Sequence, residues 1–579
     1  MAAVHAVNAS PRRRMISWQL SCYLPCRMLA AEIERIGLTV ARSPRASLAV
    51  IFVVALACML PGFATMAPLD GDEPGYAVAA REMVATNDYA TVRLQTEETE
   101  WRPRGAYWIQ AFFMRIAGPS PPIWVARLPS LAAGVGAAML TWWMAMAFAA
   151  PVTALIAGLF VAASGIVGLE ARLATPDAIL LAATTLCGGA LARLWLKRNG
   201  RPDDLVALVF WTGLGLAVLA KGWIAPAIVL AAIAILSLER GTLRWTMQLR
   251  PGLGAVWLFL LVSPWLIAVA LTLLQGITDS PSLQYLVSIG VPFQLQAPPG
   301  SYALILPLLA GPAATFIFTG LPWFATELRR PVVFFALAWG GPLWLAAELV
   351  DVKEPQWVLP AIPAVVLLAA AAIDAGKAKI GGRISWFYSL GPLLWPPLVA
   401  LIVPAIFLAI EDRFPWFAAA AFAVAAILGP VTWFWLHRGL LVAAALMSVA
   451  TVFFIYLGFF GSFVPGLSGL RIGEQVAALA RGAQPCTPQT FAAAGYPEES
   501  LVYTLGPDTR LVDAWSAADF LNTAGCRIAI VDVSQISAFR QRAEDLGLAL
   551  VDRGHVSGFD LRKMRVVDVH LFVAGGGAP

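Results

Sequence analysis

Three carboxylates lie within four positions in the stretch LDGDEPGYAVAAREM, which covers residues 69–83. They are Asp70, Asp72 and Glu73, and they follow an apolar run that begins at Ser47. A positioned carboxylate can take a proton from an attacking hydroxyl group. Negative charge gathered at the end of an apolar run therefore indicates a candidate catalytic turn, although a turn of this composition also occurs as a plain solvated loop.

Further ionisable residues stand at the ends of other apolar runs. Asp177 opens one run in TPDAIL, Lys221 closes another in LAVLAKGW, and Lys353 precedes a third in DVKEPQWVLP. Acids and cations together suit the transfer of a group from a phosphate, because cations offset the charge of the leaving phosphate and a carboxylate activates the acceptor. The structural alternatives are a helix N-cap for Asp177 and a lysine that snorkels to the interface for Lys221.

The composition is that of a membrane protein. Of the 579 residues, 59% are apolar and only 13% are charged, whereas soluble domains are about half apolar and a quarter charged. The formal net charge is +5, and the absence of a basic stripe with interleaved aromatic residues argues against nucleic-acid binding. We expect no cofactor: a divalent metal is conceivable, but the four histidines, His5, His437, His555 and His570, all fall outside the outer loops between spans.

Apolar stretches recur along most of the chain. A spanning helix needs about 20 apolar residues, and about thirteen stretches approach this length, so the sequence predicts a polytopic α-helical membrane protein. They lie at 47–64, 122–148, 152–169, 177–196, 204–220, 223–238, 253–274, 302–324, 332–350, 356–374, 386–409, 415–436 and 440–462.

Lysine and arginine are distributed unevenly among the connections. If the arginine-rich segment 1–46 is cytoplasmic, the connections that return to that side carry most of the basic residues, while the outer loop 275–301 carries none. Basic residues favour the cytoplasmic side of a membrane. We therefore predict a cytoplasmic N-terminal segment, a membrane domain over 47–464, and an extracytoplasmic position for the loop 65–121 and for the C-terminal region.

Two extracytoplasmic units are expected. The loop 65–121 has helical patterns near Tyr76–Ala85 and Ala106–Ile116, and the second is amphipathic, which suits a helix at the membrane surface. From 465 to 579 the runs LVYTL, RIAIVDV and VVDVHLFV read as strands, and RIGEQVAALARG, SAADFLNTAG and SQISAFRQRAEDLG read as helices. This alternation predicts a small periplasmic α/β domain. Whether Cys486 and Cys526 form a disulfide in it is left open.

Several short motifs occur in an order that resembles a known family. They are DEPGYAVAAREM, WRPRGAYWIQA, ARLPS, TPDAIL, AKG and KEPQWVLP, followed by GYPEESLVYTLG and VSGFDLRKMRVVDVHLFV near the end. The chain resembles the family 39-type glycosyltransferases of the GT-C class, which include protein O-mannosyltransferases and the bacterial transferase that adds aminoarabinose to lipid A. The resemblance covers nearly the whole chain; each motif is weak alone, and together they are fairly specific.

The resemblance implies a GT-C fold and a sugar transfer from a polyprenyl-phosphate donor at the periplasmic face of a bacterial inner membrane. The acceptor would be lipid A, another envelope glycolipid, a glycan or a protein. By resemblance Asp72 is the catalytic carboxylate, Asp177 the second acid and Lys221 a ligand of the lipid phosphate. The remaining expected site residues are Glu73 beside the acids, Arg102, Arg81 and Lys353 at the donor phosphate, and Tyr76, Tyr107 and Trp357 at the substrate.

The chain also departs from the family's pattern. Gly75 stands where an arginine is common, Arg102 is preceded by Trp101 where the aminoarabinose enzymes carry an acidic metal ligand, and Gln356 stands where a histidine is common. We therefore expect no zinc site. The main alternative function is a transporter or flippase of a lipid-linked precursor, although the ionisable residues gather at one face whereas transporter sites lie near the midplane. A weaker alternative is a sensory or structural protein whose C-terminal domain binds a periplasmic partner.

Overall fold

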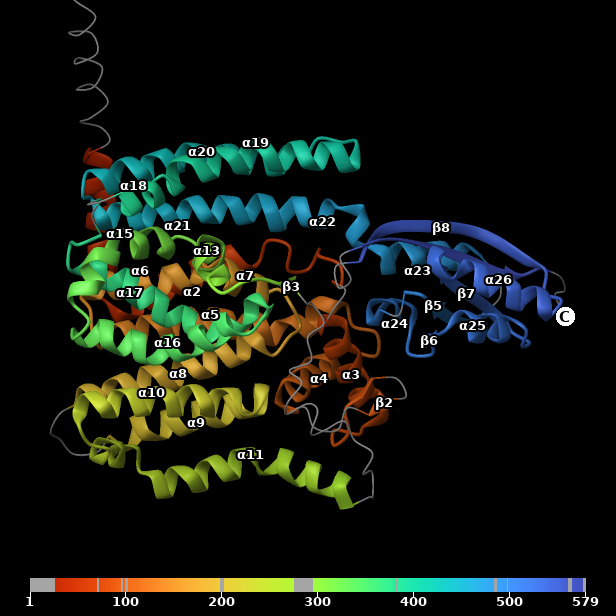
Figure 1. Ribbon diagram of the computed structural model, residues 1–579, viewed down its shortest axis with the longest axis horizontal. Coiled ribbons are helices and arrows are strands. Elements are labelled where there is room, and N and C mark those ends of the chain that lie inside the picture. Colours follow the sequence, from red (N-terminus) through yellow and green to blue (C-terminus); the bar gives the residue numbers. More distant parts are fainter. Residues whose placement is uncertain are drawn as a thin grey trace, which may run out of the picture.

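The computed structural model consists of a helical bundle with an α/β domain at one end (Figure 1). It describes residues 27–69, 72–94, 97–98, 103–197, 203–274, 295–378, 380, 383–483, 487–496, 498–560 and 565–575. The C-terminal domain and the helices of the loop 65–121 lie at the same end of the bundle (Figure 1).

The bundle is built from apolar helices of membrane-spanning length. Among the described residues nine helices are long and apolar enough to cross a membrane, or ten if the bent pair Arg27–Ala41 and Pro44–Met59 (α2) is one span. Helices lie in all the predicted stretches, but the predicted count of about thirteen spans is not confirmed. The nine are α5 (Ile123–Ala145), α8 (Asp177–Leu196), α9 (Asp204–Lys221), α11 (Pro251–Leu274), α16 (Pro331–Leu349), η2 (Pro355–Ala361) together with α17 (Ile362–Asp374), α19 (Gly391–Glu411), α20 (Trp416–His437), and α21 (Leu441–Gly458) with its continuation. The helix α10 (Ile224–Arg240) has 17 residues and is just shorter, and α18 (Arg383–Ser389) precedes α19.

Two predicted spans are broken into shorter helices. The stretch 152–169 forms α6 (Pro151–Ala162) and α7 (Gly165–Glu170), and the stretch 302–324 forms α13 (Ser301–Leu304), α14 (Leu306–Ala310) and α15 (Ala313–Thr326).

The two breaks meet, and small residues make this contact possible. A Cβ atom on Gly165 would lie 1.9 Å from the carbonyl oxygen of Leu308, so only glycine fits there. Ser164 Oγ donates to the Leu309 carbonyl at 2.7 Å, and the Tyr456 hydroxyl donates to the Ala163 carbonyl at 3.0 Å. These bonds satisfy backbone groups that a helix break leaves open inside an apolar bundle.

The segment between α2 and α5 contains two helices, α3 (Asp72–Thr86) and α4 (Gly105–Ala117), with the short strands β1 (Arg93–Leu94) and β2 (Glu97–Glu98) between them. The rings of Tyr76 and Tyr107 stack with centroids 4.8 Å apart and so join α3 to α4. A Cβ on Gly105 would lie 2.7 Å from the carbonyl oxygen of Leu219, which brings the start of α4 onto the end of α9.

The C-terminal domain is a five-stranded sheet with helices on both faces. The strands are β5 (Gln489–Ala494), β6 (Arg510–Val512), β7 (Cys526–Asp532), β8 (Leu550–Asp560) and β9 (Arg565–Ala574), in the order β6-β5-β7-β9-β8. β5 runs parallel to β6 and β7, and β9 runs antiparallel to β7 and β8. The helices are α23 (Ile472–Ala483), α24 (Glu499–Leu505), α25 (Ala514–Leu521) and α26 (Ile536–Asp545).

One predicted strand of this domain is wrong. LVYTL forms most of α24, which ends where Gly506 adopts a φ of 123° and donates its N–H to the Val502 carbonyl. A five-residue apolar run does not distinguish a strand from a short buried helix by its periodicity. Cys526 is disulfide-bonded, while Cys486 lies outside the described residues.

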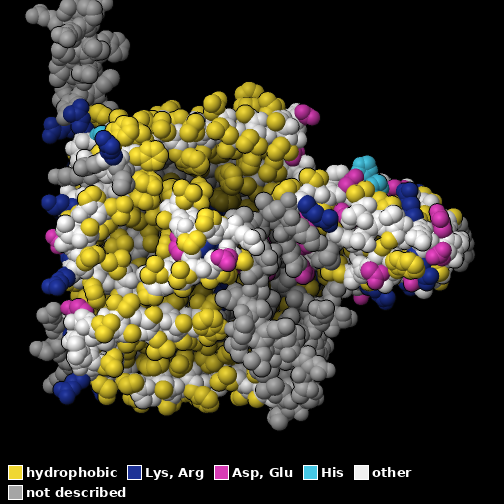
Figure 2. All heavy atoms as spheres, viewed as in Figure 1, with side chains coloured by type: hydrophobic (Ala, Val, Ile, Leu, Met, Phe, Trp, Pro, Cys, Tyr) yellow, Lys and Arg dark blue, Asp and Glu magenta, His cyan; other side chains and the backbone are white. Residues whose placement is uncertain are grey.

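Basic residues gather at one end of the bundle. Figure 2 shows lysine and arginine side chains along the end opposite the C-terminal domain, while the visible sides of the bundle are mostly apolar. This distribution is typical of a membrane protein whose basic end faces the cytoplasm.

A buried arginine organises the connection between α2 and α3. The side chain of Arg127 is 0% exposed, and its Nε donates to Glu73 Oε1 at 2.6 Å. Its Nη1 donates to the carbonyls of Phe63 and Met66, and its Nη2 to the carbonyl of Ala67 and to Glu73 Oε2. The connection after α2 therefore wraps around one guanidinium, and these contacts fix the position of the start of α3.

A second buried arginine, Arg172, holds the preceding residues. Its Nε donates to the Pro61 carbonyl at 2.7 Å, and its two terminal nitrogens donate to the carbonyls of Gly168 and Cys58. Its guanidinium also lies 4.1 Å from the centre of the Phe460 ring.

We predict that Arg127→Leu strongly destabilises the membrane domain, because the substitution leaves the Glu73 carboxylate buried without its counter-ion. Removal of one partner of a buried ion pair costs about 3–5 kcal/mol of the free energy of unfolding. Thermal unfolding in detergent measures the effect, with exposed Arg115→Leu on α4 as control. An Arg127→Leu variant with wild-type stability would contradict the assignment.

Candidate functional site

An ion pair joins the start of α8 to the end of α9. Lys221 Nζ donates to Asp177 Oδ1 at 2.7 Å, and both side chains are largely buried. The N-cap position of α8 is taken by Pro176, and Asp177 is the first helical residue, so the N-cap alternative does not describe it. Lys221 is the last residue of α9, where a cation is favoured by the helix dipole, and Gly222 ends the helix with a φ of 64°.

Asp72 faces the same pair from a third helix. It is the first residue of α3, where the helix dipole stabilises an anion. The carboxylates of Asp72, Asp177 and Glu170 all lie within electrostatic reach of the Lys221 ammonium group. The structure thus brings together three residues, Asp72, Asp177 and Lys221, that the sequence places in separate motifs.

Two further carboxyl groups belong to this cluster and were not among the expected site residues. Glu170, at the end of α7, is 4% exposed, and its Oε2 accepts a hydrogen bond from Thr175 Oγ1 at 2.8 Å. Glu354, at the N-cap of η2, is also 4% exposed and lies within reach of Asp72, Asp177 and Lys221. The signal for both was present in the sequence, since Glu354 directly follows Lys353 and Glu170 ends an apolar run seven residues before Asp177.

The backbone around Glu354 is fixed, whereas one of its carboxyl oxygens is not engaged. The Tyr302 hydroxyl donates to the Glu354 carbonyl at 2.8 Å, and Gln356 Nε2 donates to Glu354 Oε2 at 2.9 Å. Glu354 Oε1 is buried and has no hydrogen-bond partner among the described residues. Burial raises the pKa of Glu354 to about 7, the nearby charge of Asp72 adds to this, and Lys221 opposes it.

Glu73 lies next to Asp72 in sequence but points elsewhere. Its Oε1 accepts hydrogen bonds from Arg127 Nε and the Ala174 N–H, and its Oε2 accepts from Arg127 Nη2 and the Leu69 N–H. Four donors therefore surround this carboxylate. Such a group is suited to hold Asp72 in place and not to exchange protons with a substrate.

The expected substrate contacts are partly accounted for by packing. Tyr107 is fully buried and stacks on the half-buried Tyr76, so these two rings join α3 to α4. Trp357 is half-buried in η2, and its backbone N–H donates to the Glu354 carbonyl at 3.0 Å. Of the three, Trp357 is the nearest in sequence to a carboxyl of the cluster.

Lys353 is engaged away from the cluster. Its Nζ donates to the carbonyls of Ala347, Glu348 and Val350, the last turn of α16 and the residue after it, at 2.9, 2.6 and 2.6 Å. All three ammonium protons can be used in this way. Lys353 therefore acts as a C-terminal cap of α16, which leaves little capacity for a phosphate.

Arg81 connects the membrane domain to the C-terminal domain. Its Nη1 and Nη2 donate to the carbonyls of Tyr503 and Val502 at 2.9 and 3.0 Å, and its guanidinium lies 4.9 Å from the centre of the Tyr503 ring. The Tyr503 hydroxyl in turn donates to the Pro121 carbonyl at 2.7 Å. Arg81 is thus an interdomain contact on the helix that begins with Asp72.

Arg102, the fourth expected phosphate ligand, lies outside the described residues. In the part of the chain that the structure describes, no group of three or more His, Cys, Asp or Glu side chains is arranged to hold a metal ion.

Comparison with solved structures gives the fold. The chain is similar to ArnT from Cupriavidus metallidurans in the apo state, with a TM-score of 0.71 and 18% identity over 91% of this chain and 98% of that one. It is similar to the same protein bound to undecaprenyl phosphate, with a TM-score of 0.69 and 19% identity over 90% and 97% of the two chains. The chain has the GT-C fold.

Sequence comparisons agree with this GT-C fold. The family model described as dolichyl-phosphate-mannose-protein mannosyltransferase matches residues 102–267, a segment that contains Asp177 and Lys221. The undecaprenyl phosphate-alpha-4-amino-4-deoxy-L-arabinose arabinosyl transferase of Edwardsiella ictaluri (strain 93-146) is 26% identical over 374 residues, 60% of this chain and 63% of that protein, less than two thirds of its length. An uncharacterized protein of Aquifex aeolicus (strain VF5) is 25% identical over 61% of this chain and 72% of its own. Together these likenesses support a GT-C, ArnT-like glycosyltransferase.

We predict that Glu354 makes the stability of the protein depend on pH. Its pKa in the folded protein is about 7 against an ordinary value of 4.5. The folded state therefore holds a proton that the unfolded chain releases, so the stabilising contribution is complete below pH 4.5 and is lost as the pH rises through 7. Glu354→Gln cannot release a proton and should remove this decline.

Thermal unfolding of both proteins in detergent, from acidic to mildly alkaline pH, tests this prediction. The difference between wild type and Glu354→Gln should fall as the pH rises and then level off, while the exposed Glu327→Gln control should follow wild type. A difference that stays constant with pH would show that Glu354 does not titrate in this way.

Proposed function

We propose that this protein transfers a sugar from a polyprenyl-phosphate donor to a hydroxyl group of an acceptor in the cell envelope. The observation that carries the proposal is the convergence of Asp72, Asp177 and Lys221 from three helices. The helix α3, which begins with Asp72, lies at the end of the bundle that carries the C-terminal domain (Figure 1), opposite the basic end. A carboxylate beside a fixed cation at the membrane surface suits a reaction in which a hydroxyl attacks and a phosphate leaves.

The proposed step balances with the residues at hand. Asp72 accepts the proton of the acceptor hydroxyl while that oxygen forms a bond to the anomeric carbon of the sugar. The bond between this carbon and the phosphate oxygen breaks, and the phosphate leaves with the electron pair. The Lys221 ammonium offsets the charge that develops on the leaving phosphate, which is where a fixed cation lowers the barrier most.

The remaining residues take supporting roles in this proposal. Asp177 orients Lys221 through their 2.7 Å contact, and Glu73 holds α3 through Arg127. Glu354 offers a buried carboxyl oxygen to a sugar hydroxyl, beside Trp357. Arg102 stays a predicted ligand of the donor phosphate, while the contacts of Arg81 and Lys353 favour positioning roles.

The relatives support the choice of donor. The Edwardsiella ictaluri protein is named for a sugar carried on undecaprenyl phosphate, and one Cupriavidus metallidurans structure holds undecaprenyl phosphate. The donor of this chain would accordingly be a sugar on undecaprenyl phosphate or a similar lipid. We leave the sugar open as hexose or pentose, and the acceptor as lipid A, another glycolipid, a glycan or a protein.

We further propose that the enzyme works at the periplasmic face of a bacterial inner membrane. The basic end of the bundle would face the cytoplasm, and α3, α4 and the C-terminal domain would face the periplasm. Nothing in the comparisons favours the flippase alternative. Proteoliposomes separate the two, because a flippase moves the lipid across the bilayer without forming a new glycosidic bond.

We predict that Asp72→Asn abolishes transfer while the protein still folds. The amide keeps the size of the carboxylate but cannot accept the proton, and loss of a general base costs about 10²–10⁴-fold in rate. The envelope lipids and glycans of a deletion strain, complemented with each variant and analysed by mass spectrometry, report the activity. Glu82→Gln, on the same helix, is the matched control, and full modification in the Asp72→Asn strain would refute the assignment.

We predict that Lys221→Met weakens the binding of undecaprenyl phosphate by about tenfold or more, since a hydrogen bond to a charged group contributes about 1.5–3 kcal/mol. Titration of the purified protein with undecaprenyl phosphate, followed by native mass spectrometry, measures the affinity. Lys353→Met is the matched control: it removes the cap of α16 and should lower the melting temperature without changing the affinity of the folded protein. Unchanged binding by Lys221→Met would contradict the role of Lys221.

A further inference from the structure

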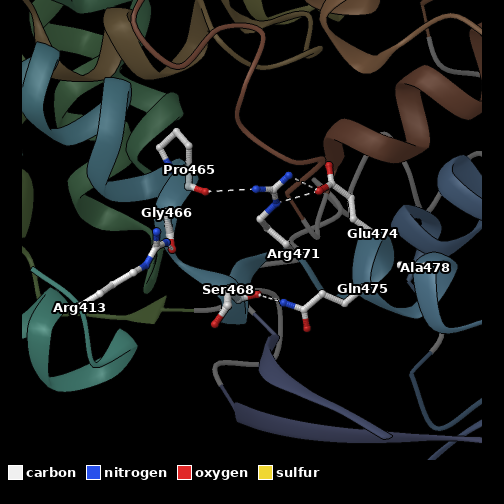
Figure 3. A pocket seen from close by; sticks show the side chains of 8 residues that line it. All are labelled: Arg413, Pro465, Gly466, Ser468, Arg471, Glu474, Gln475 and Ala478. Atoms are coloured by element: carbon white, nitrogen blue, oxygen red, sulfur yellow. Dashed lines mark hydrogen bonds and ion pairs between the residues drawn. The ribbon is translucent and has the colours of Figure 1, made fainter. Parts of the chain in front are cut away.

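A polar cavity lies where the membrane bundle meets the C-terminal domain. Its volume is about 330 Å³, and it lies between the turn that joins α19 to α20 and the start of α23 (Figure 3). The connection from α22 (Val464–Gly466) through η4 (Ser468–Leu470) forms the wall between them. The polar side chains that line it are Arg413, Ser468, Arg471, Glu474 and Gln475.

The lining of this cavity has two guanidinium groups and one carboxylate. Arg471 Nε donates to Glu474 Oε2 at 2.7 Å, so the charge of Arg471 is largely matched. Arg413 Nη2 donates to the Gly466 carbonyl at 2.8 Å, and its guanidinium lies 5.3 Å from the centre of the Phe407 ring. Neither contact supplies Arg413 with an anion. The lining therefore carries an excess of one positive charge.

The surroundings of Arg413 place it at the level of lipid headgroups. Arg413 belongs to the four-residue turn between α19 and α20, both of which are candidate spans. The aromatic side chains that follow it are exposed: Phe414 by 39%, Trp416 by 78% and Phe417 by 57%. Exposed aromatic residues next to an arginine at the end of a span are typical of the membrane–water interface.

Nearby acidic groups leave this cation available. Glu411 Oε1 accepts hydrogen bonds from the N–H and the hydroxyl of Ser468 at 2.7 and 2.9 Å, so it is committed to holding the wall of the cavity. Figure 3 shows Arg413 beside Gly466 and Arg471 between Pro465 and Glu474, with Ser468 and Gln475 below Arg471. A planar guanidinium can offer parallel donors to a phosphate.

We propose that this cavity binds the phosphate of a lipid headgroup in the outer leaflet, with Arg413 as the principal ligand. Arg471 shares its donors between Glu474 and the phosphate, and Gln475 supplies a neutral donor. The acyl chains would lie against the exposed apolar surface of α19 and α20. The bound lipid would fasten the junction between the two domains to the membrane surface, independently of sugar transfer.

Native mass spectrometry of the full-length protein in detergent tests this proposal with two probes that differ only in the phosphate. Phosphatidic acid should give an adduct, and diacylglycerol with the same chains should not. Arg413→Gln with Arg471→Gln should weaken the phosphatidic acid adduct by about tenfold or more. Arg438→Gln is the matched control, because Arg438 follows the far end of α20, the helix that Arg413 precedes. Its guanidinium lies 5.2 Å from the centre of the Phe434 ring, so both arginines contact an aromatic ring.

A variant that binds phosphatidic acid more strongly than wild type tests the site without the risk that lost binding reflects misfolding. Glu474→Gln removes the one carboxylate in the lining and releases the donors of Arg471, so it should strengthen the adduct. Equal binding of phosphatidic acid to wild type, the double variant and Glu474→Gln would overturn the site. Inorganic phosphate alone binding as tightly as phosphatidic acid would overturn the lipid as the source of the phosphate.

Discussion

The buried ion pair between Arg127 and Glu73 is the contact on which the candidate site depends. The Arg127 guanidinium donates hydrogen bonds to three carbonyls of the connection after α2 and to both carboxylate oxygens of Glu73, the second residue of α3. Because every donor has an acceptor, the pair meets the condition under which a buried charge is tolerated. Asp72 precedes Glu73 by one residue, so its position follows directly from that of its neighbour.

This arrangement divides two adjacent carboxylates between two tasks. Glu73 is enclosed by hydrogen-bond donors from Arg127, Leu69 and Ala174. Asp72, in contrast, is exposed at the start of the helix and interacts electrostatically with Lys221. Sequence alone cannot make this distinction, since both residues are acids in one turn. The partner that settles it, Arg127, lies 54 positions away.

The cluster around Lys221 is rich in carboxyl groups, and this limits how the phosphate of the sugar donor can bind there. Asp72, Asp177, Glu170 and Glu354 share the neighbourhood of one described ammonium group. A phosphate entering such a site meets repulsion unless some carboxyls are protonated or further cations approach. The raised pKa of Glu354 supplies part of this relief near neutral pH, and Arg102 is the further cation that the sequence suggests.

The general architecture and the converging site could be predicted from the sequence because they rest on strong local signals. Long apolar runs, the asymmetry of basic residues and the motifs around Asp72, Asp177 and Lys221 are each visible in the chain. The failures have a common cause in contacts that hydrophobic patterns and motifs do not encode. The broken spans depend on the fit of Gly165 against Leu308, the α24 helix on its docking to α3, and the role of Lys353 on the carbonyls of the preceding helix.

The contact between Arg81 and α24 has a consequence for how the two domains can evolve. Arg81 donates to main-chain carbonyls, so these two hydrogen bonds do not depend on which side chain stands at position 502 as long as α24 keeps its helical end. Tyr503 instead contributes its ring and its hydroxyl group. Exchange of the C-terminal domain for that of a homologue would therefore preserve the joint only if an aromatic hydroxyl arrives at that one position.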